Sequence, residues 1–224
     1  SISLGLQTAY GQYSANLSSL SWGNQFNGKR FDSRINSNEK FLIRSSNYFD
    51  LGSGIYYQLK KSNSAFLGSN VSSLNIGIAG YHLNQPKQSF FSDSKDVLPL
   101  KIVAQVAGIF DLKDSKLALV PSMFYATQKS FNEITAGVLF KIKMGSGTKY
   151  SGLLKKGAIY FGSHYRFNDA IIPQVKLEFT DYMIGISYDY NISQLSNVTG
   201  GNGGLEISIR YINKPKPLQR SSFK

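Results

Sequence analysis

The residues of this sequence that could carry out chemistry are few. There is no Cys, and the two histidines are His82 and His164. The absence of Cys excludes disulfides, thiol catalysis and Cys-bound zinc, and two histidines leave little for a metal site or a catalytic triad. His164 stands two residues before Arg166, but no Gly-x-Ser-x-Gly nucleophile motif occurs. We therefore expect both histidines to be structural, and the protein to be no enzyme and to use no metal or cofactor.

Six charged residues share one face of four successive amphipathic stretches near the C-terminal end. They are Arg166, Lys176, Glu178, Asp189, Glu206 and Arg210. If these stretches are neighbouring strands of a barrel, the six side chains point into the same part of its lumen. They could line a polar channel or a wall that binds a plug, or they could form an internal ion-pair network. Both signs of charge are present and an unpaired charge in a narrow lumen is costly, so we favour the ion-pair network.

The stretches that must position these charges alternate between apolar and polar residues with a period of two. In Tyr182–Ser193, aromatic and aliphatic residues occupy one face, and small or polar residues, including Asp189, occupy the other. Similar stretches recur along the chain. They are Ser1–Ser14, Tyr48–Leu59, Ser73–Leu83, Leu98–Asp111, Leu117–Gln128, Asn132–Lys143, Lys155–Phe167, Ala170–Phe179 and Gly203–Ile212, with a short possible strand at Asn16–Trp22. Within Leu117–Gln128, Pro121 must occupy a bulge or a locally unpaired position.

The number and length of these stretches indicate the fold class. About ten or eleven strands of roughly ten residues each have the length that crosses a bilayer, whereas soluble strands are usually nearer five or six residues. No apolar run reaches the roughly 18 residues of a membrane-spanning helix. The pattern favours an all-β, antiparallel, transmembrane outer-membrane β-barrel over the alternative, a soluble β-sandwich or lipocalin-like fold.

The distribution of charge and the strand count indicate the organisation of the chain. The net charge is +12, but the basic residues cluster between the strands, so we expect no nucleic-acid binding. If the C-terminus is periplasmic, an odd count of strands places Ser1 at the outer rim. Closed bacterial barrels normally have an even number of strands. We therefore expect residues 1–212 to be the C-terminal portion of a longer barrel of about 12–14 strands, and 213–224 to be a basic tail.

The same count assigns the longer loops Asn24–Ser46 and Asn84–Val97 to the outside of the membrane. The second of these loops carries Phe90 and Phe91 in the run FFSDSKD. Two adjacent phenylalanines in an exposed loop could contact a partner, or they could pack on the barrel rim. We take Phe90 and Phe91 as the candidate contacts for an outer partner.

An ordered set of segments resembles the PorP/SprF family of Bacteroidetes outer-membrane proteins, which are associated with type IX secretion and gliding motility. The segments are YFDLGSGIYY (48–57), GIAGYHLNQPKQSFF (77–91), LVPSMFYATQ (119–128), GSHYRFNDAII (162–172), GISYDYNISQL (185–195) and GGLEISIRY (203–211). Their order and spacing agree with the family along nearly the whole chain, although the family's N-terminal segment has no counterpart here.

The resemblance implies a non-enzymatic barrel in the outer membrane of a Gram-negative, Bacteroidetes-type bacterium. Such a barrel would serve secretion or surface anchoring of large cargo such as adhesins. Its partners would be outer-membrane lipid, the C-terminal domain of the cargo or adhesin, and periplasmic or outer-membrane components of the type IX system. The family has no catalytic residues to transfer to this chain. The alternative function is a passive or substrate-specific outer-membrane channel.

Overall fold

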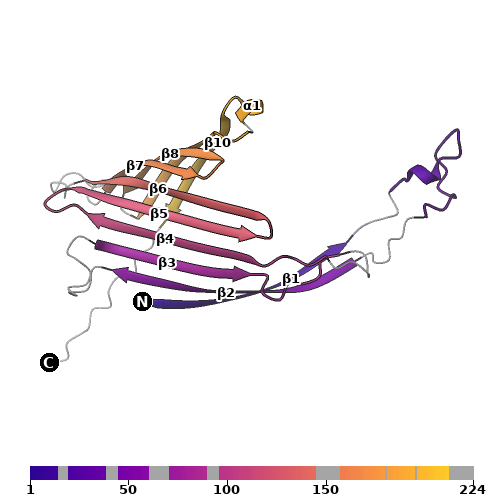
Figure 1. Cartoon of the computed structure of the whole chain (residues 1–224), viewed down its shortest axis with the longest axis horizontal. Coiled ribbons are helices and arrows are strands. Elements are labelled where there is room, and N and C mark those ends of the chain that lie inside the picture. The colour runs from indigo at the N-terminus through magenta and orange to yellow at the C-terminus, as the bar shows by residue number, and fades with distance from the viewer. Residues whose placement is uncertain are drawn as a thin grey trace.

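The computed structural model describes residues 1–14, 20–38, 45–60, 71–89, 96–144, 157–179, 181–194 and 196–211 (Figure 1). Within these residues, ten antiparallel strands form a single sheet in sequence order. The strands are β1 (Ile2–Ser14), β2 (Ser45–Lys60), β3 (Val71–Tyr81), β4 (Lys101–Asp111), β5 (Leu117–Gln128), β6 (Phe131–Lys143), β7 (Gly157–Arg166), β8 (Ala170–Phe179), β9 (Tyr182–Asn191) and β10 (Asn202–Tyr211). Helical structure in the described part of the chain is limited to a 3-10 turn, η2 (Gly23–Gln25), and the short α1 (Ser196–Thr199). The all-β prediction is confirmed.

The sheet is a simple meander, because each strand pairs only with its neighbours in the sequence. β1 and β10 are paired on one side only, so the sheet curls but does not close (Figure 1). Nine successive reversals make β1 and β10 antiparallel, and Ser1 therefore lies at the end of the sheet where β10 finishes. The prediction that Ser1 lies at the rim opposite the end of β10 is wrong, because that prediction rested on a count of eleven strands. Of that proposed strand, Asn16–Trp22, the described residues 20–22 are not in a strand.

The sheet has an apolar face and a polar face, and the apolar face is uncovered. Large side chains such as Leu6, Val175 and Ile186 are 88%, 56% and 53% exposed. The buried apolar cluster of the described residues lies instead on the polar face, where Leu139 and Tyr160 pack around Ala158. A soluble protein buries its apolar face against a core, whereas a membrane barrel turns that face to lipid. This inverted arrangement is typical of a membrane β-barrel wall.

Two prolines interrupt the ladders as proline chemistry requires, since proline has no N–H to donate. Pro121 pairs with Val138 on β6, but the ladder between β4 and β5 has no pair at Pro121. The prediction of a locally unpaired position at Pro121 is therefore confirmed. Pro173 in β8 leaves the same kind of gap toward β9, which the sequence analysis did not anticipate.

The predicted loops are only partly described. Residues 24–38 contain most of η2 and a short bridge between Phe26 and Phe31, in keeping with a predicted loop rather than a long strand. Phe90, Phe91 and the basic tail 213–224 lie outside the described residues. None of the described helices is long and apolar enough to cross a membrane.

Candidate functional site on the polar face of β6 to β10

The register of β6 to β10 brings the charged residues into adjacent rows on the polar face. Tyr160 on β7 pairs with Lys141 on β6 and with Lys176 on β8. In the next row, Met183 on β9 pairs with Glu178 and with Arg210. The strands have a strict period of two, so every charge on this side of the sheet faces the same space.

Arg166, at the end of β7, is surrounded by three carboxylates. Its Nη1 lies 3.0 Å from Asp169 Oδ2 and 3.0 Å from Asp189 Oδ2, and its Nε lies 3.8 Å from Glu133 Oε1. The carboxylates come from β6, the β7–β8 turn and β9, so Arg166 connects three segments. A guanidinium suits this position, because its planar fork can donate to several acceptors at once.

Glu178 on β8 is the centre of a second cluster. Tyr160 donates a hydrogen bond of 2.5 Å to Glu178 Oε2, and Lys141 Nζ lies 3.2 Å from the same oxygen. Lys141 Nζ also lies 4.8 Å from the centroid of the Tyr160 ring, within the range of a cation–π contact. This cluster reaches from β6 to β8 across β7. The sequence analysis missed Lys141 and Tyr160 as members of it, although the period of two places both on the polar face.

A third group of charged side chains, the ion pair between Lys143 and Asp111, lies toward β4. Lys143 Nζ on β6 lies 2.6 Å from Asp111 Oδ1 at the end of β4, and Ser72 Oγ on β3 donates to the other oxygen of Asp111. Like the Glu178 cluster, this pair joins strands that are not neighbours. The interactions therefore stabilise the curvature of the sheet in addition to individual ladders.

The other three predicted residues are not brought into these clusters. Within the described part of the chain, Lys176, Glu206 and Arg210 form no ion pair. Glu206 and Arg210 belong to β10, which has no neighbour on its outer side. Lys176 and Arg210 lie toward the other end of the strands, in the rows of Tyr160 and Glu178, where Glu178 pairs with Lys141 instead.

Both histidines make structural contacts. His164 Nε2 lies 2.7 Å from Ser122 Oγ on β5, and Gln174 Nε2 on β8 lies 2.6 Å from His164 Nδ1. The donor and acceptor roles in these two contacts depend on the tautomer of His164, and in either tautomer the ring links β5 to β8 across the sheet. His82 Nδ1 pairs with Asp50 Oδ2 at 2.9 Å, where β2 and β3 meet the loop after β3.

An antiparallel meander with an uncovered apolar face and an ion-paired polar face belongs to the class of membrane β-barrels. The model of one protein family, described as the type IX secretion system membrane protein PorP/SprF, matches residues 1–211. The chain belongs to this family, as its segments suggested. No match was found among curated proteins or among solved structures.

Proposed function

We propose that this protein is a non-enzymatic outer-membrane barrel of a Gram-negative, Bacteroidetes-type bacterium. It serves secretion, or cell-surface anchoring, of large type IX cargo such as adhesins. The family match over residues 1–211 carries this proposal. Its partners are outer-membrane lipid on the apolar face, the C-terminal domain of the cargo at the outer loops, and other type IX components at the inner rim.

The ion pairs on the polar face favour an accessory or anchoring role over the alternative, a passive or substrate-specific channel. A selective pore presents rings of like charge whose field acts on the passing ion. Here Arg166 and Glu178 interact with neighbouring side chains of opposite charge or with hydroxyls. Such contacts stabilise the barrel wall. Because the opposite charges largely cancel, a weaker electrostatic field remains in the lumen to select ions.

The unpaired edges of β1 and β10 allow a test of the proposal that residues 1–212 form the C-terminal portion of a longer barrel, since ten strands are an even number and do not by themselves require a further strand. In lipid, every backbone N–H and C=O needs a partner, so both edges must be paired by further strands or by each other. Residues 1–224 contain no Cys, so cysteines engineered within them do not compete with natural cysteines of this segment in a cross-linking experiment.

We expect a cysteine at Leu4 on β1 to give no cross-link with cysteines placed at Leu205, Ile207 or Ile209 on β10. The measurement is cross-linking of the natural protein in its membrane by a short bis-maleimide, read as a mobility shift. The positive control is the pair Ile184 and Ile209, which are directly opposite in the β9–β10 register. Efficient cross-linking between β1 and β10 would show that ten strands close the barrel, and the longer barrel would be abandoned.

The function is tested by affinity purification from native membranes with mass-spectrometric identification of the proteins retained. We expect a large type IX cargo protein to be retained, and the purified barrel to capture the isolated C-terminal domain of that cargo.

Exchanging Phe90 and Phe91 for Ser should weaken this capture about tenfold or more, because aromatic residues dominate such contacts. The control is Phe131→Ser, an exposed phenylalanine at the first position of β6. A steady large conductance in planar bilayers, with no cargo retained, would instead favour the channel.

A further inference from the structure

The hairpin of β1 and β2 extends beyond the rest of the sheet. β2 pairs with β1 from Ser45 onward, but it pairs with β3 only from Ser53 onward. The eight residues 45–52 and the opposite residues 7–14 therefore form a two-stranded projection, which we call the arm. At about 3.3 Å per residue, a strand of this length spans about 26 Å. Figure 1 shows β1 and β2 running past the end of β3.

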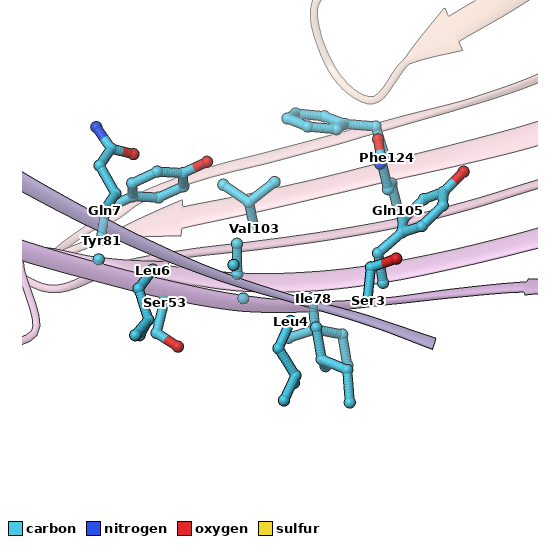
Figure 2. A pocket seen from close by; sticks show the side chains of 17 residues that line it. Ser3, Leu4, Leu6, Gln7, Ser53, Ile78, Tyr81, Val103, Gln105 and Phe124 are labelled. Carbon is cyan, nitrogen blue, oxygen red and sulfur yellow. The ribbon is translucent and has the colours of Figure 1, made fainter. Parts of the chain in front are cut away.

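Two large side chains lie at the base of the arm, where β2 separates from β3. A Cβ atom built at Gly52 would be 3.4 Å from Tyr81 Cδ1 and 3.6 Å from Gln7 Cβ, so both side chains are close to this glycine. Figure 2 shows Gln7 and Tyr81 next to each other on one side of the sheet, whereas Leu4 and Leu6 point to the other side. The missing side chain at Gly52 therefore leaves room for a contact that supports the base of the arm.

The loop after β3 holds the arm from its side. The backbone N–H of Leu83 donates to Leu51 O at 2.9 Å, and Asn84 Oδ1 accepts a hydrogen bond of 3.1 Å from the Leu51 N–H. Further along the arm, the side-chain amide of Gln88 donates to the hydroxyl of Tyr13. These contacts are additional to the ladder between β1 and β2, so they restrict bending of the arm relative to the sheet.

The chain that connects β1 to β2 contains a hydrogen-bonded tip, which comprises the described residues 20–38. Gln25, the last residue of η2, is buried in the tip. Its Nε2 donates to Ile35 O at 3.0 Å, and its Oε1 accepts a hydrogen bond of 3.1 Å from the Trp22 N–H. The backbone N–H of Asp32 donates to Gln25 O at 2.8 Å. One residue therefore connects three parts of the tip, which orders its backbone before a partner binds.

The tip presents two phenylalanines on one side of a short hairpin. Phe26 and Phe31 form an antiparallel bridge, so the two side chains leave the backbone in the same direction. They are 58% and 48% exposed. Aromatic residues are enriched at the centres of protein interfaces, and an ordered backbone reduces the entropy that is lost on binding. The two rings therefore suit the role of anchors for a protein partner.

Three cations accompany the two phenylalanines. Lys29 and Arg30 lie in the turn between them, and Arg34 follows in the sequence. Within the described chain, none of these three side chains takes part in an ion pair. The carboxylate of Asp32 accepts a hydrogen bond of 3.0 Å from the backbone N–H of Arg34. With three cations and one carboxylate, residues 20–38 have a net charge of +2 that the tip does not balance.

We propose that the tip is where the barrel recognises its cargo, and that the cargo presents to it an apolar pocket bordered by carboxylates. This inference rests on the proposed function, and it adds the recognising surface and the chemistry of the partner. The pocket receives Phe26 and Phe31, which no core of the tip covers. The carboxylates complement the cations of the tip, and such complementarity speeds association and selects the partner.

A protein fits the position of the tip better than a lipid surface does. The headgroup layer of a bilayer is only about 5–8 Å thick on each side. Even with strands tilted by about 45°, the arm extends about 18 Å beyond the point where β2 leaves β3. The tip follows the far end of the arm in the chain, so the headgroups around the barrel are too near the sheet to be its partner.

The test measures binding of the isolated C-terminal domain of the cargo to the full purified barrel by biolayer interferometry. One variant combines Phe26→Ser with Phe31→Ser, and the other combines Lys29→Gln with Arg30→Gln. We expect each to weaken binding about tenfold or more. The loss in the second variant should shrink when salt rises from about 0.05 M to about 0.5 M, because salt screens the attraction in the wild type.

The matched control for charge combines Lys113→Gln with Lys116→Gln, in the turn between β4 and β5 at the opposite end of the sheet. The control for an exposed ring is Phe131→Ser, and heat-modifiable migration checks that every variant is folded.

Unchanged cargo binding in both tip variants would overturn this inference and leave the proposed function standing. An equal loss in the charge control would also overturn it, because the attraction would then be unspecific. A wild-type barrel that binds no type IX cargo domain would remove the proposed function and this inference together. The inference is overturned in favour of lipid if phosphatidylglycerol vesicles bind the wild type, the tip variants lose that binding, and cargo binding is unchanged.

Discussion

Replacement of Arg166 by Ala is expected to lower the free energy of unfolding by about 3 kcal/mol, through uncompensated charge in a partly buried cluster. Three carboxylates, those of Glu133, Asp169 and Asp189, converge on this guanidinium. The Asp189 side chain is only 16% exposed, so water replaces the lost cation poorly. Without Arg166, the carboxylates also repel each other across β6, β7 and β9. The measurement is urea-induced unfolding in detergent, or the temperature at which the folded band is lost in gel electrophoresis.

Two comparisons separate charge from packing at Arg166. Arg166→Lys keeps the cation but loses the planar fork, so its cost should be about half as large. Combining Arg166→Gln with Asp189→Asn should lower the free energy of unfolding less than Arg166→Gln alone does. The second exchange removes a carboxylate that has lost its counter-charge. Arg210→Ala is the matched control, since Arg210 forms no ion pair among the described residues and should change stability by less than about 1 kcal/mol. Equal effects at Arg166 and Arg210 would show that the cluster contributes nothing specific.

Replacement of Gly137 by Val is expected to prevent folding or to cost more than about 3 kcal/mol. Gly137 on β6 lies directly opposite His164 on β7. A Cβ at this glycine would overlap the backbone oxygen of Ser163 and would lie 2.6 Å from His164 Cα. Because backbone atoms cause the clash, no rotamer change relieves it, and β6 and β7 would have to separate. The resulting displacement would also break the contact between His164 and Ser122.

The matched control is Gly5→Ala on β1, where a Cβ meets only one atom, at an ordinary contact distance. This exchange should be close to neutral, or slightly stabilising through loss of glycine's freedom in the unfolded chain. Heat-modifiable migration of both variants, after refolding under the same conditions, compares them directly. If Gly137→Val refolds with wild-type yield and stability, the close approach of β6 and β7 is not a constraint on the fold.

The inverted distribution of apolar residues connects the fold to the family. An isolated soluble sheet with side chains such as Leu6 and Ile186 exposed would aggregate, whereas lipid covers them in a barrel. The polar face must be stabilised by contacts between its own side chains. The Arg166 and Glu178 clusters and the small apolar core around Tyr160 supply these contacts. The wall is therefore held from inside by polar contacts and from outside by lipid.

The sequence by itself determined the strands and their faces. The bounds predicted for Leu117–Gln128 and Ala170–Phe179 agree with β5 and β8, and most other strands differ by up to three residues at an end. The strands are predictable because side-chain direction alternates along each strand. A strand with one face toward lipid therefore shows alternating apolar and polar residues in its own sequence. The gap at Pro121 was predictable for the same reason, since a missing N–H is a property of one residue.

Only the tertiary structure decided which side chains meet. Lys141 and Glu178 are on strands separated by β7, and the sequence of neither strand specifies this contact. Register depends on loop lengths, ladder gaps and packing across the sheet, which are non-local. For that reason the six predicted charges divided into paired and unpaired residues. Ser1 was placed at the wrong rim for a different reason, since the sequence pattern suggested an eleventh strand.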